Sequence, residues 1–311
     1  MTITLPRTLP ASWYTSTALC SLERRAVFLK AWYLLGPVIK FAAGQPVSYE
    51  FSGVELTAAG DPDNQRSVHV VNSNGQPLRS HVTRTGLVFT TITAAAPTFD
   101  VFFPGLEDVL AKVDFTARPY RRSIKYHGHF NWKAMIDGVL YPPTFYAVEN
   151  HHNWSQHFAD PTKPDDGLFL YFLPGCTLNV YGGGMSLFRV CPTLDPSTTR
   201  MEFDYFNVDD GEKFEEYYAF VQQVALEDYE LCENAQYNLE RGIYAEGVLN
   251  PVKENGVACE CPRTTPWRHM QAYRLITSPD YQQRVLEMVL EQHQEDRQAA
   301  RHGKTARLSV D

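Results

Sequence analysis

The stretch DGEKFEEYYAFVQQVALEDYELCENAQYNLER, residues 210–241, has the pattern of one long amphipathic helix. Apolar residues that recur at steps of three and four share one face of a helix. Here that predicted buried face consists of Phe214, Tyr217, Val221, Val224, Leu231 and Ala235. Gly242 is the predicted stop, because glycine commonly follows the last turn of a helix. The step that this series lacks falls on Asp228.

Asp228 would place a carboxylate in the middle of an apolar face. Such a group is costly unless it is paired, hydrogen-bonded or turned toward a cavity. We expect it to face a cavity, with a pKa above the ordinary value of about 3.9 because burial disfavours the charged form. A second interpretation stays open, in which Asp228 is a structural acid that caps a loop or pairs with an arginine.

The chain before this helix is rich in predicted strands. A short helix is expected at 17–33, followed by β structure over about 46–103 and a strand within 113–131. Three further strand candidates occupy 168–182, 184–194 and 199–208, and a last helix is expected at about 279–300. A sheet followed by one long helix predicts an α+β helix-grip fold, in which the sheet curls around the helix and encloses a cavity.

Composition limits the possible functions. The chain has 311 residues and a net charge of -8, and nucleic-acid binding instead needs a basic face. No apolar run is long enough to cross a bilayer, and the first residues lack the apolar core of a signal peptide, so a cytoplasmic protein is expected. The 6 cysteines are scattered, which predicts reduced thiols rather than a zinc site.

A second informative stretch is FNWKAMIDGVLYPPTFYAVENHH, residues 130–152. It predicts a helix that begins near Asn131 and carries Asp137 and Tyr141 on one face, four residues apart. Pro142 and Pro143 then end this helix, because proline lacks the backbone donor and clashes with the preceding turn.

Four blocks of the sequence together resemble a known family. They are LPASWYTSTALCSLERRAVFLKAWYLL (9–35), TGLVF (85–89), HGHFNWKAMIDG (127–138) and ALEDYELCENAQYNLERGIYAEGVLNP (225–251). In this order they resemble the catalytic α-subunits of Rieske non-haem iron oxygenases, closest to the choline-monooxygenase-like branch. The resemblance implies a Rieske-type β-domain, here reduced to a remnant at 1–112, and a helix-grip catalytic domain at 113–311.

The sequence departs from that family at its metal ligands. The Cys-x-His and Cys-x-x-His pairs that hold the family's iron–sulfur cluster do not occur in this chain. By the family's spacing, the two iron-binding histidines fall on Thr144 and Glu149, and the acid that bridges the metal centres falls on Tyr141. Only the third iron ligand is retained, as Asp228. The prediction is therefore no metal and no cofactor, although a displaced site formed by His152, His157 and Asp228 stays open.

These observations predict an enzyme that needs no cofactor: a cyclase, isomerase or lyase of a small lipophilic metabolite in a biosynthetic pathway, by analogy with helix-grip polyketide cyclases. The predicted catalytic residues are Asp228, Glu149 and Tyr141, and the predicted substrate-binding residues are Asp137, Thr144, Phe145, His152, Asn179 and Tyr181. The alternatives are a non-catalytic small-molecule-binding protein, a hydrolase or lyase with a relocated metal, and an inactive partner subunit of an oxygenase.

The expected partner is a small-molecule substrate, with no nucleic acid or membrane. A monomer or homodimer is expected, because the family's head-to-tail trimers depend on the cluster domain.

Overall fold

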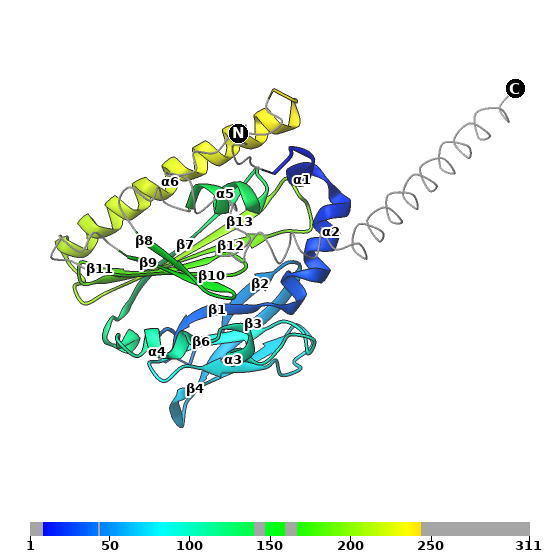
Figure 1. Ribbon diagram of the computed structural model, residues 1–311. Helices are drawn as coiled ribbons and strands as arrows, with labels where there is room; N and C mark the ends of the chain where they lie inside the picture. The colour runs from blue at the N-terminus through cyan, green and yellow to red at the C-terminus, as the bar shows by residue number, and fades with distance from the viewer. Residues whose placement is uncertain (1–8, 43, 140–146, 159–166, 244–311) are drawn as a thin grey trace, which may run out of the picture. The chain divides into compact units, whose positions relative to one another are not determined.

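Seven antiparallel strands form the largest sheet of the protein, in the order β7-β13-β12-β11-β10-β9-β8 (Figure 1). The strands are β7 (Tyr120–Gly128), β8 (Ala147–Asn150), β9 (Trp154–Phe158), β10 (Leu168–Phe172), β11 (Cys176–Tyr181), β12 (Gly184–Pro192) and β13 (Thr199–Asn207). The strands predicted in this region are confirmed, with one difference. The stretch 168–182 is two strands, β10 and β11, because Pro174 and Gly175 make a turn in its middle.

The structure is a computed structural model that describes residues 9–42, 44–139, 147–158 and 167–243. All of these belong to one compact unit, Met1–Arg268. The predicted helix at 279–300 lies outside the described residues. Among the helices that are described, none is long and apolar enough to cross a membrane.

The N-terminal part contributes two three-stranded sheets. One has the order β1-β6-β5, formed by Trp32–Pro37, Leu87–Thr91 and Ser80–Val82, and the other has the order β2-β3-β4, formed by Val47–Phe51, Val54–Asp61 and Asn64–Asn72. Short helices accompany them: α1 (Ser12–Thr15), α2 (Thr17–Ala26), α3 (Phe99–Phe102) and α4 (Leu106–Leu110), with 3-10 turns η1 (Phe28–Lys30), η2 (Val38–Phe41) and η3 (Phe115–Ala117).

The predicted helix at 17–33 is shorter than expected. It ends at Ala26, and Trp32 and Tyr33 belong to strand β1. Both rings are buried there, and the Tyr33 hydroxyl donates a hydrogen bond of 2.7 Å to the Phe28 carbonyl. Burial of these aromatic rings in a strand therefore overrides the helical period of the sequence.

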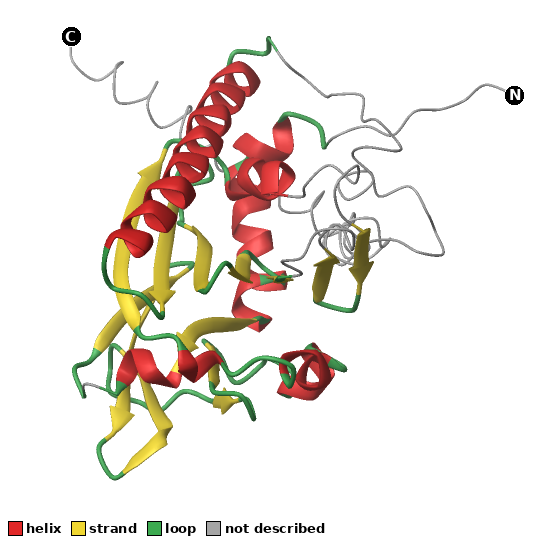
Figure 2. Cartoon of the chain, turned by 90° about the vertical axis from the view of Figure 1, so that its left-hand side faces the viewer, coloured by secondary structure: helices red, strands yellow, loops and turns green. Residues whose placement is uncertain are grey.

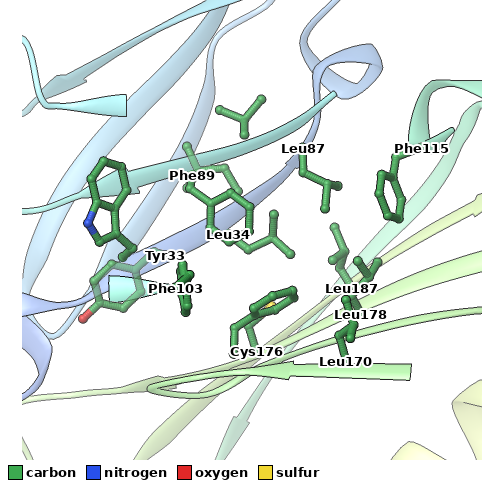
Figure 3. Packing of buried hydrophobic residues seen from close by; sticks show 14 of the residues in the cluster. Tyr33, Leu34, Leu87, Phe89, Phe103, Phe115, Leu170, Cys176, Leu178 and Leu187 are labelled. Carbon is green, nitrogen blue, oxygen red and sulfur yellow. The ribbon is translucent and has the colours of Figure 1, made fainter. Parts of the chain in front are cut away.

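Each strand of the large sheet divides its side chains between two faces. One face packs on the N-terminal sheets through Leu170, Leu178 and Leu187, which join Leu34 and Phe89 in a single apolar core (Figure 3). Alternation along a strand sends the intervening side chains to the opposite face. Because this core includes residues from both sides of position 112, the predicted domain boundary there stays a prediction.

Helices α5 (Trp132–Val139) and α6 (Glu212–Glu240) lie over the second face of the sheet (Figures 1 and 2). They pack on it with Met201, Phe203 and Tyr205 of β13. The predicted face of α6 is confirmed at Phe214, which is buried, but it is wrong after Asp228.

The C-terminal half of α6 turns a different set of residues inward. Leu231 is 67% exposed, whereas Cys232, Gln236 and Leu239 are buried. The steps of 4, 4 and 3 from Asp228 to these residues keep to the 3.6-residue period. The prediction chose Leu231 and Ala235 because they are apolar, but the buried residues are their chain neighbours Cys232 and Gln236.

The Asn131-Trp132-Lys133 segment at the start of α5 is held by a buried acid of α2. Glu23 accepts a hydrogen bond of 3.0 Å from Trp132 Nε1, and its other oxygen lies 2.8 Å from Lys133 Nζ. Both charged side chains are almost fully buried. This pair therefore fixes the entry of α5 against the N-terminal helix.

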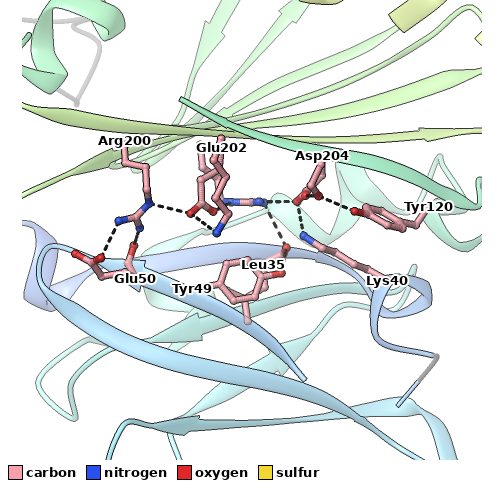
Figure 4. Close-up of polar contacts among 11 residues, drawn as sticks. Leu35, Lys40, Tyr49, Glu50, Tyr120, Arg200, Glu202 and Asp204 are labelled. Atoms are coloured by element: carbon pink, nitrogen blue, oxygen red, sulfur yellow. Dashed lines mark hydrogen bonds and ion pairs between the residues drawn. The ribbon is translucent and has the colours of Figure 1, made fainter. Parts of the chain in front are cut away.

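A second and larger group of buried charges connects β12 and β13 to the N-terminal sheets (Figure 4). Arg189 Nη2 lies 2.5 Å from Asp204 Oδ2, and Lys40 Nζ lies 2.6 Å from the same oxygen. Arg189 Nε lies 3.3 Å from Glu202 Oε2, and Arg200 Nε lies 3.0 Å from Glu202 Oε1. We call Lys40, Arg189, Arg200, Glu202 and Asp204 the buried ionic network.

The network perturbs its own titration. Burial raises the pKa of Asp204, but the positive charges of Arg189 and Lys40 outweigh burial and hold that pKa at about 2. Burial lowers the pKa of Lys40 to about 8, although Asp204 opposes the shift. Asp204 is thus ionised at every pH at which the protein would ordinarily be studied.

We expect Asp204→Asn to lower the free energy of unfolding by about 3–5 kcal/mol at neutral pH, because it leaves Arg189 and Lys40 buried without their shared counter-charge. Since the folded pKa lies below the ordinary value of about 3.9, the stabilisation by Asp204 is complete above about pH 4 and is lost as the pH falls toward 2. Urea unfolding across this pH range measures both effects. Asp108→Asn is the control, because Asp108 is 88% exposed in its ion pair with Arg84. Equal losses in the two variants would contradict the prediction.

Candidate functional site

The second face of the large sheet and helix α6 enclose a cavity with two adjoining chambers. The Asp228 chamber has a volume of about 70 Å³ and is lined by Met135, Thr177, Asn179, Ser186, Phe188, Phe203, Val221, Val224, Ala225 and Asp228. The His157 chamber has a volume of about 340 Å³ and is lined by His157, Phe169, Asn179, Tyr181, Phe220, Val221 and Val224. Asn179, Val221 and Val224 border both chambers, so the two spaces meet at these residues.

Strand alternation explains the polar wall of the cavity. In β11, Cys176, Leu178 and Val180 are buried in the core shared with the N-terminal sheets. Thr177, Asn179 and Tyr181 therefore point to the α6 side. In β12, Ser186 is the register partner of Asn179, and Phe188 is the partner of Thr177. Two neighbouring strands thus place an amide and a hydroxyl side by side on the cavity wall.

Aromatic rings form much of the remaining lining. Phe188 and Phe203 stack with ring centroids 4.4 Å apart at the Asp228 chamber, and Phe169 and Tyr181 stack at 5.6 Å at the His157 chamber. Tyr217 of α6 approaches Tyr181, with centroids 5.7 Å apart. The ring of Tyr217 fits there because residue 184 is glycine: a Cβ at Gly184 would lie 2.7 Å from Tyr217 Cζ.

Among the described residues that line the two chambers, Asp228 is the one acid. Burial, and to a smaller extent the neighbouring charge of Glu227, raise its pKa to about 6. No lysine, arginine or histidine in the described part of the chain forms an ion pair with it. The prediction of a cavity-facing carboxyl group with a raised pKa is confirmed, and the alternative of a pairing with arginine is not observed among these residues.

The predicted site residues do not all meet here. Asn179, Tyr181 and Asp228 line the cavity, as expected. Glu149 lies on the edge strand β8, its side chain is 60% exposed, and its nearest charged partner is His151 at 3.6 Å. The predicted convergence of Glu149 with Asp228 is therefore not observed.

The remaining predicted residues are placed only in part. His152 is partly buried, which lowers its pKa, and it is not among the cavity-lining residues. Asp137 belongs to α5, but its side chain is not described. Tyr141, Thr144 and Phe145 lie outside the described residues. Their proposed roles stay predictions.

Sequence reasoning missed several residues of the cavity. His157 was considered only as a metal ligand, and Ser186 and Phe188 were not predicted as site residues. The Gly182-Gly183 pair was the available signal, because a two-residue glycine turn predicts a hairpin. That hairpin would have placed Ser186 opposite Asn179.

Few side chains that border the cavity can donate a lone pair to a metal. A carboxylate, Asp228, and an imidazole, His157, border the cavity, but no group of three His, Cys, Asp or Glu side chains suited to a metal occurs within the described ranges. The buried thiols are poor candidates as well, because burial raises the pKa of Cys176 and of Cys191 to about 12 and a metal binds the thiolate. The described residues therefore do not complete the usual site of two histidines and one carboxylate.

Comparisons with known proteins identify the fold. Residues 145–259 match the family described as ring hydroxylating alpha subunit (catalytic domain). The quaternary ammonium Rieske monooxygenase CntA, solved in complex with L-carnitine, is similar in structure at a TM-score of 0.71 and 16% identity, over 82% of this chain and 93% of that chain. Naphthalene 1,2-dioxygenase from Rhodococcus sp., bound to indole, gives a TM-score of 0.63 at 12% identity, over 88% and 95%. No curated protein matches the chain.

The described fold is therefore a mixed α/β fold of the Rieske oxygenase kind. This finding contradicts the predicted cyclase, isomerase or lyase that works without a cofactor, and with it the alternatives of a non-catalytic binding protein and of a hydrolase or lyase with a relocated metal. The alternative of an inactive partner subunit of an oxygenase stays a prediction. The matched family is described as ring hydroxylating, and the two similar structures are a monooxygenase and a dioxygenase. The prediction failed because it inferred a reaction from missing ligands instead of from the scaffold that is present.

We expect Asp228→Asn to stabilise the protein relative to the parent above pH 6. The folded pKa of Asp228 is raised, so ionising this carboxyl costs more in the folded than in the unfolded chain, and the amide avoids that cost. The gain should grow from about pH 4 to about pH 6 and stay constant above, since the unfolded chain titrates near 3.9. Unfolding by urea at a series of pH values measures it. Asp63→Asn, at an exposed turn, should show no such profile, and a flat profile for Asp228→Asn would refute the assignment.

Proposed function

We propose that this protein binds a small organic cation, an amine or a quaternary ammonium compound, in the cavity and takes part in its oxidation. The observation that carries this proposal is Asp228, an acid without a described cationic partner in a cavity lined by aromatic rings. A carboxylate and the faces of aromatic rings both attract a cation, most strongly where water is excluded. The reaction class rests on the ring-hydroxylating family match.

The chain's own residues have distinct roles in this proposal. Asp228 holds the cationic group, and its own proton is displaced when the cation binds. Phe188 and Phe203 pack on the alkyl groups of that cation, while Asn179 and Ser186 offer hydrogen bonds to a polar substituent. The similar protein CntA, a quaternary ammonium Rieske monooxygenase, was solved with its substrates L-carnitine and gamma-butyrobetaine, each of which contains a quaternary ammonium group.

Iron would supply the oxygen chemistry in this family, but the described residues provide only Asp228 and His157 toward it. No step is therefore assigned to a metal. We infer in addition that the chain is a reduced relative of the Rieske oxygenases without the cluster motifs, and that its seven-stranded sheet and α6 form a helix-grip domain. A cytoplasmic location and a monomeric or homodimeric state belong to the same proposal.

Choline and 3,3-dimethylbutan-1-ol test the charge preference, because they have the same shape and differ in charge. We expect choline to bind at least about tenfold more tightly at pH 8, and we expect this preference to fall toward pH 5 as Asp228 takes up a proton. Isothermal titration calorimetry measures both ligands. Asp228→Asn should abolish the preference at each pH, whereas Glu149→Gln should retain it because Glu149 is exposed. Equal affinities in the parent protein would refute the cation site.

The oxidation is tested by incubating the ligand with protein, Fe(II), oxygen and a reductant, and by mass spectrometry of the products. An oxygenated or dealkylated product that depends on Asp228 supports the proposal. Recovery of unchanged ligand from a protein that binds it would overturn the oxidative part alone.

We expect purified protein to lack the visible absorption of an iron–sulfur cluster, even after reconstitution with iron and sulfide. A cluster of the Rieske type needs two cysteine and two histidine ligands, and the chain contains neither Cys-x-His nor Cys-x-x-His. Cluster bands in the spectrum would contradict this expectation. Light scattering on the same sample tests the oligomeric state, and a trimer would exclude the proposed monomer or homodimer.

A further inference from the structure

A second pocket lies on the opposite face of the large sheet from the cavity. It has a volume of about 470 Å³ and is lined by Lys112, Val113, Arg118, Gln156, Phe158, Gly167, Leu168, Val180, Tyr181, Gly182 and Gly183. Leu168 and Val180 belong to the core shared with the N-terminal sheets, which places the pocket on that face. Among the described residues, Tyr181 alone lines both this pocket and the His157 chamber, and none lines both this pocket and the Asp228 chamber.

Among the residues that the structure describes, those with charge that line this pocket are both positive. They are Lys112 and Arg118. Arg118 Nη1 donates a hydrogen bond of 3.3 Å to the Asp114 carbonyl, but Arg118 Nε is buried and has no partner among the residues that the structure describes. The nearby Asp114 carboxylate is directed to Thr116, whose hydroxyl lies 2.7 Å from it. A buried guanidinium nitrogen without an acceptor is uncommon in proteins, and an anionic ligand in the pocket would supply the acceptor.

The rest of the pocket suits a small organic ligand. Gln156 adds a largely buried amide. Val113, Phe158, Leu168 and Val180 supply apolar walls. Gly182 and Gly183, which also line the pocket, have φ values of 55° and 76°, which glycine adopts without strain, and they add no side chain to the lining. A guanidinium presents its donors in a planar fork that matches a carboxylate or a phosphate.

We propose that this pocket binds the carboxylate or phosphate group of a small organic anion, with Arg118 as the principal ligand-binding residue and Lys112 as a second positive charge. The site does not depend on the proposed cation site, because it uses the other face of the sheet and different charged residues. Arg118 donates hydrogen bonds to the anion from its planar guanidinium group. Lys112 is exposed, so it attracts the anion through a longer interaction that is more strongly screened by salt.

Isothermal titration calorimetry with inorganic phosphate and with acetate, at constant ionic strength, tests this proposal on the full chain. We expect saturable binding of at least one of the two anions. Arg118→Gln should weaken that binding about tenfold or more, and Lys112→Gln should weaken it less, because a buried charge-assisted hydrogen bond contributes more than an exposed charge. Arg84→Gln removes a positive charge at an exposed ion pair and should leave anion binding unchanged. Choline binding in Arg118→Gln should equal that of the parent, which separates this site from the cavity.

Two results would overturn the proposal. One is the absence of binding of both anions to a folded parent protein, and the other is equal weakening by Arg84→Gln and Arg118→Gln. The segment 159–166, which joins two of the lining residues, carries Asp160, Asp165 and Asp166. If phosphate binds only after these aspartates are changed to asparagine, the chain's own carboxylates fill the pocket, and the proposal of an external ligand is also wrong.

Discussion

The buried ionic network determines how the two faces of the large sheet are used. Arg189 of β12 and Asp204 of β13 lie on the face toward the N-terminal sheets, where Lys40 reaches the same carboxylate oxygen. Their chain neighbours Phe188 and Phe203 must then lie on the opposite face, at the Asp228 chamber. A slip of one residue in either strand would place charges in the cavity and phenylalanines in the network. The ion pairs thus fix the register on which the cavity depends.

The network also shows why the scaffold can hold polar groups on both sides of one sheet. A buried charge is tolerated only where a partner of opposite sign is close, and each acid of the network has at least one such partner. Asp228 and Arg118 differ from these residues, because neither forms an ion pair with a described residue, although Arg118 lies close enough to the Asp114 carboxylate to lower its pKa. The two sites are therefore distinguished by their charges: one contains an acidic side chain without an ion pair, and the other contains a cationic side chain without one.

The sequence predicted local features well and distant contacts poorly. The strands β10 to β13 and the start of α6 follow from residue periodicity, because alternation and the 3.6-residue repeat are properties of neighbouring residues. The ionic network could not be predicted, since Lys40 and Asp204 are far apart in the chain and nothing local in either segment indicates the other. The same limit applies to the site. Asp228 broke an apolar pattern and was recognisable, whereas His157 and Ser186 reach the cavity only through strand pairing.

The reaction that the protein catalyses is harder to infer than its fold, both from the sequence and from the structure. The sequence alone favoured chemistry without a cofactor, because the resemblance placed Thr144 and Glu149 at the positions of the family's iron-binding histidines. The match of 145–259 to a hydroxylating family corrects that inference. Binding of an organic cation and binding of a metal ion would begin with the same step, because each would displace the proton of Asp228, whose pKa is about 6. What separates them is the second contact: a metal needs further lone pairs, whereas an alkylammonium group needs aromatic faces, and Phe188 and Phe203 provide these beside Asp228.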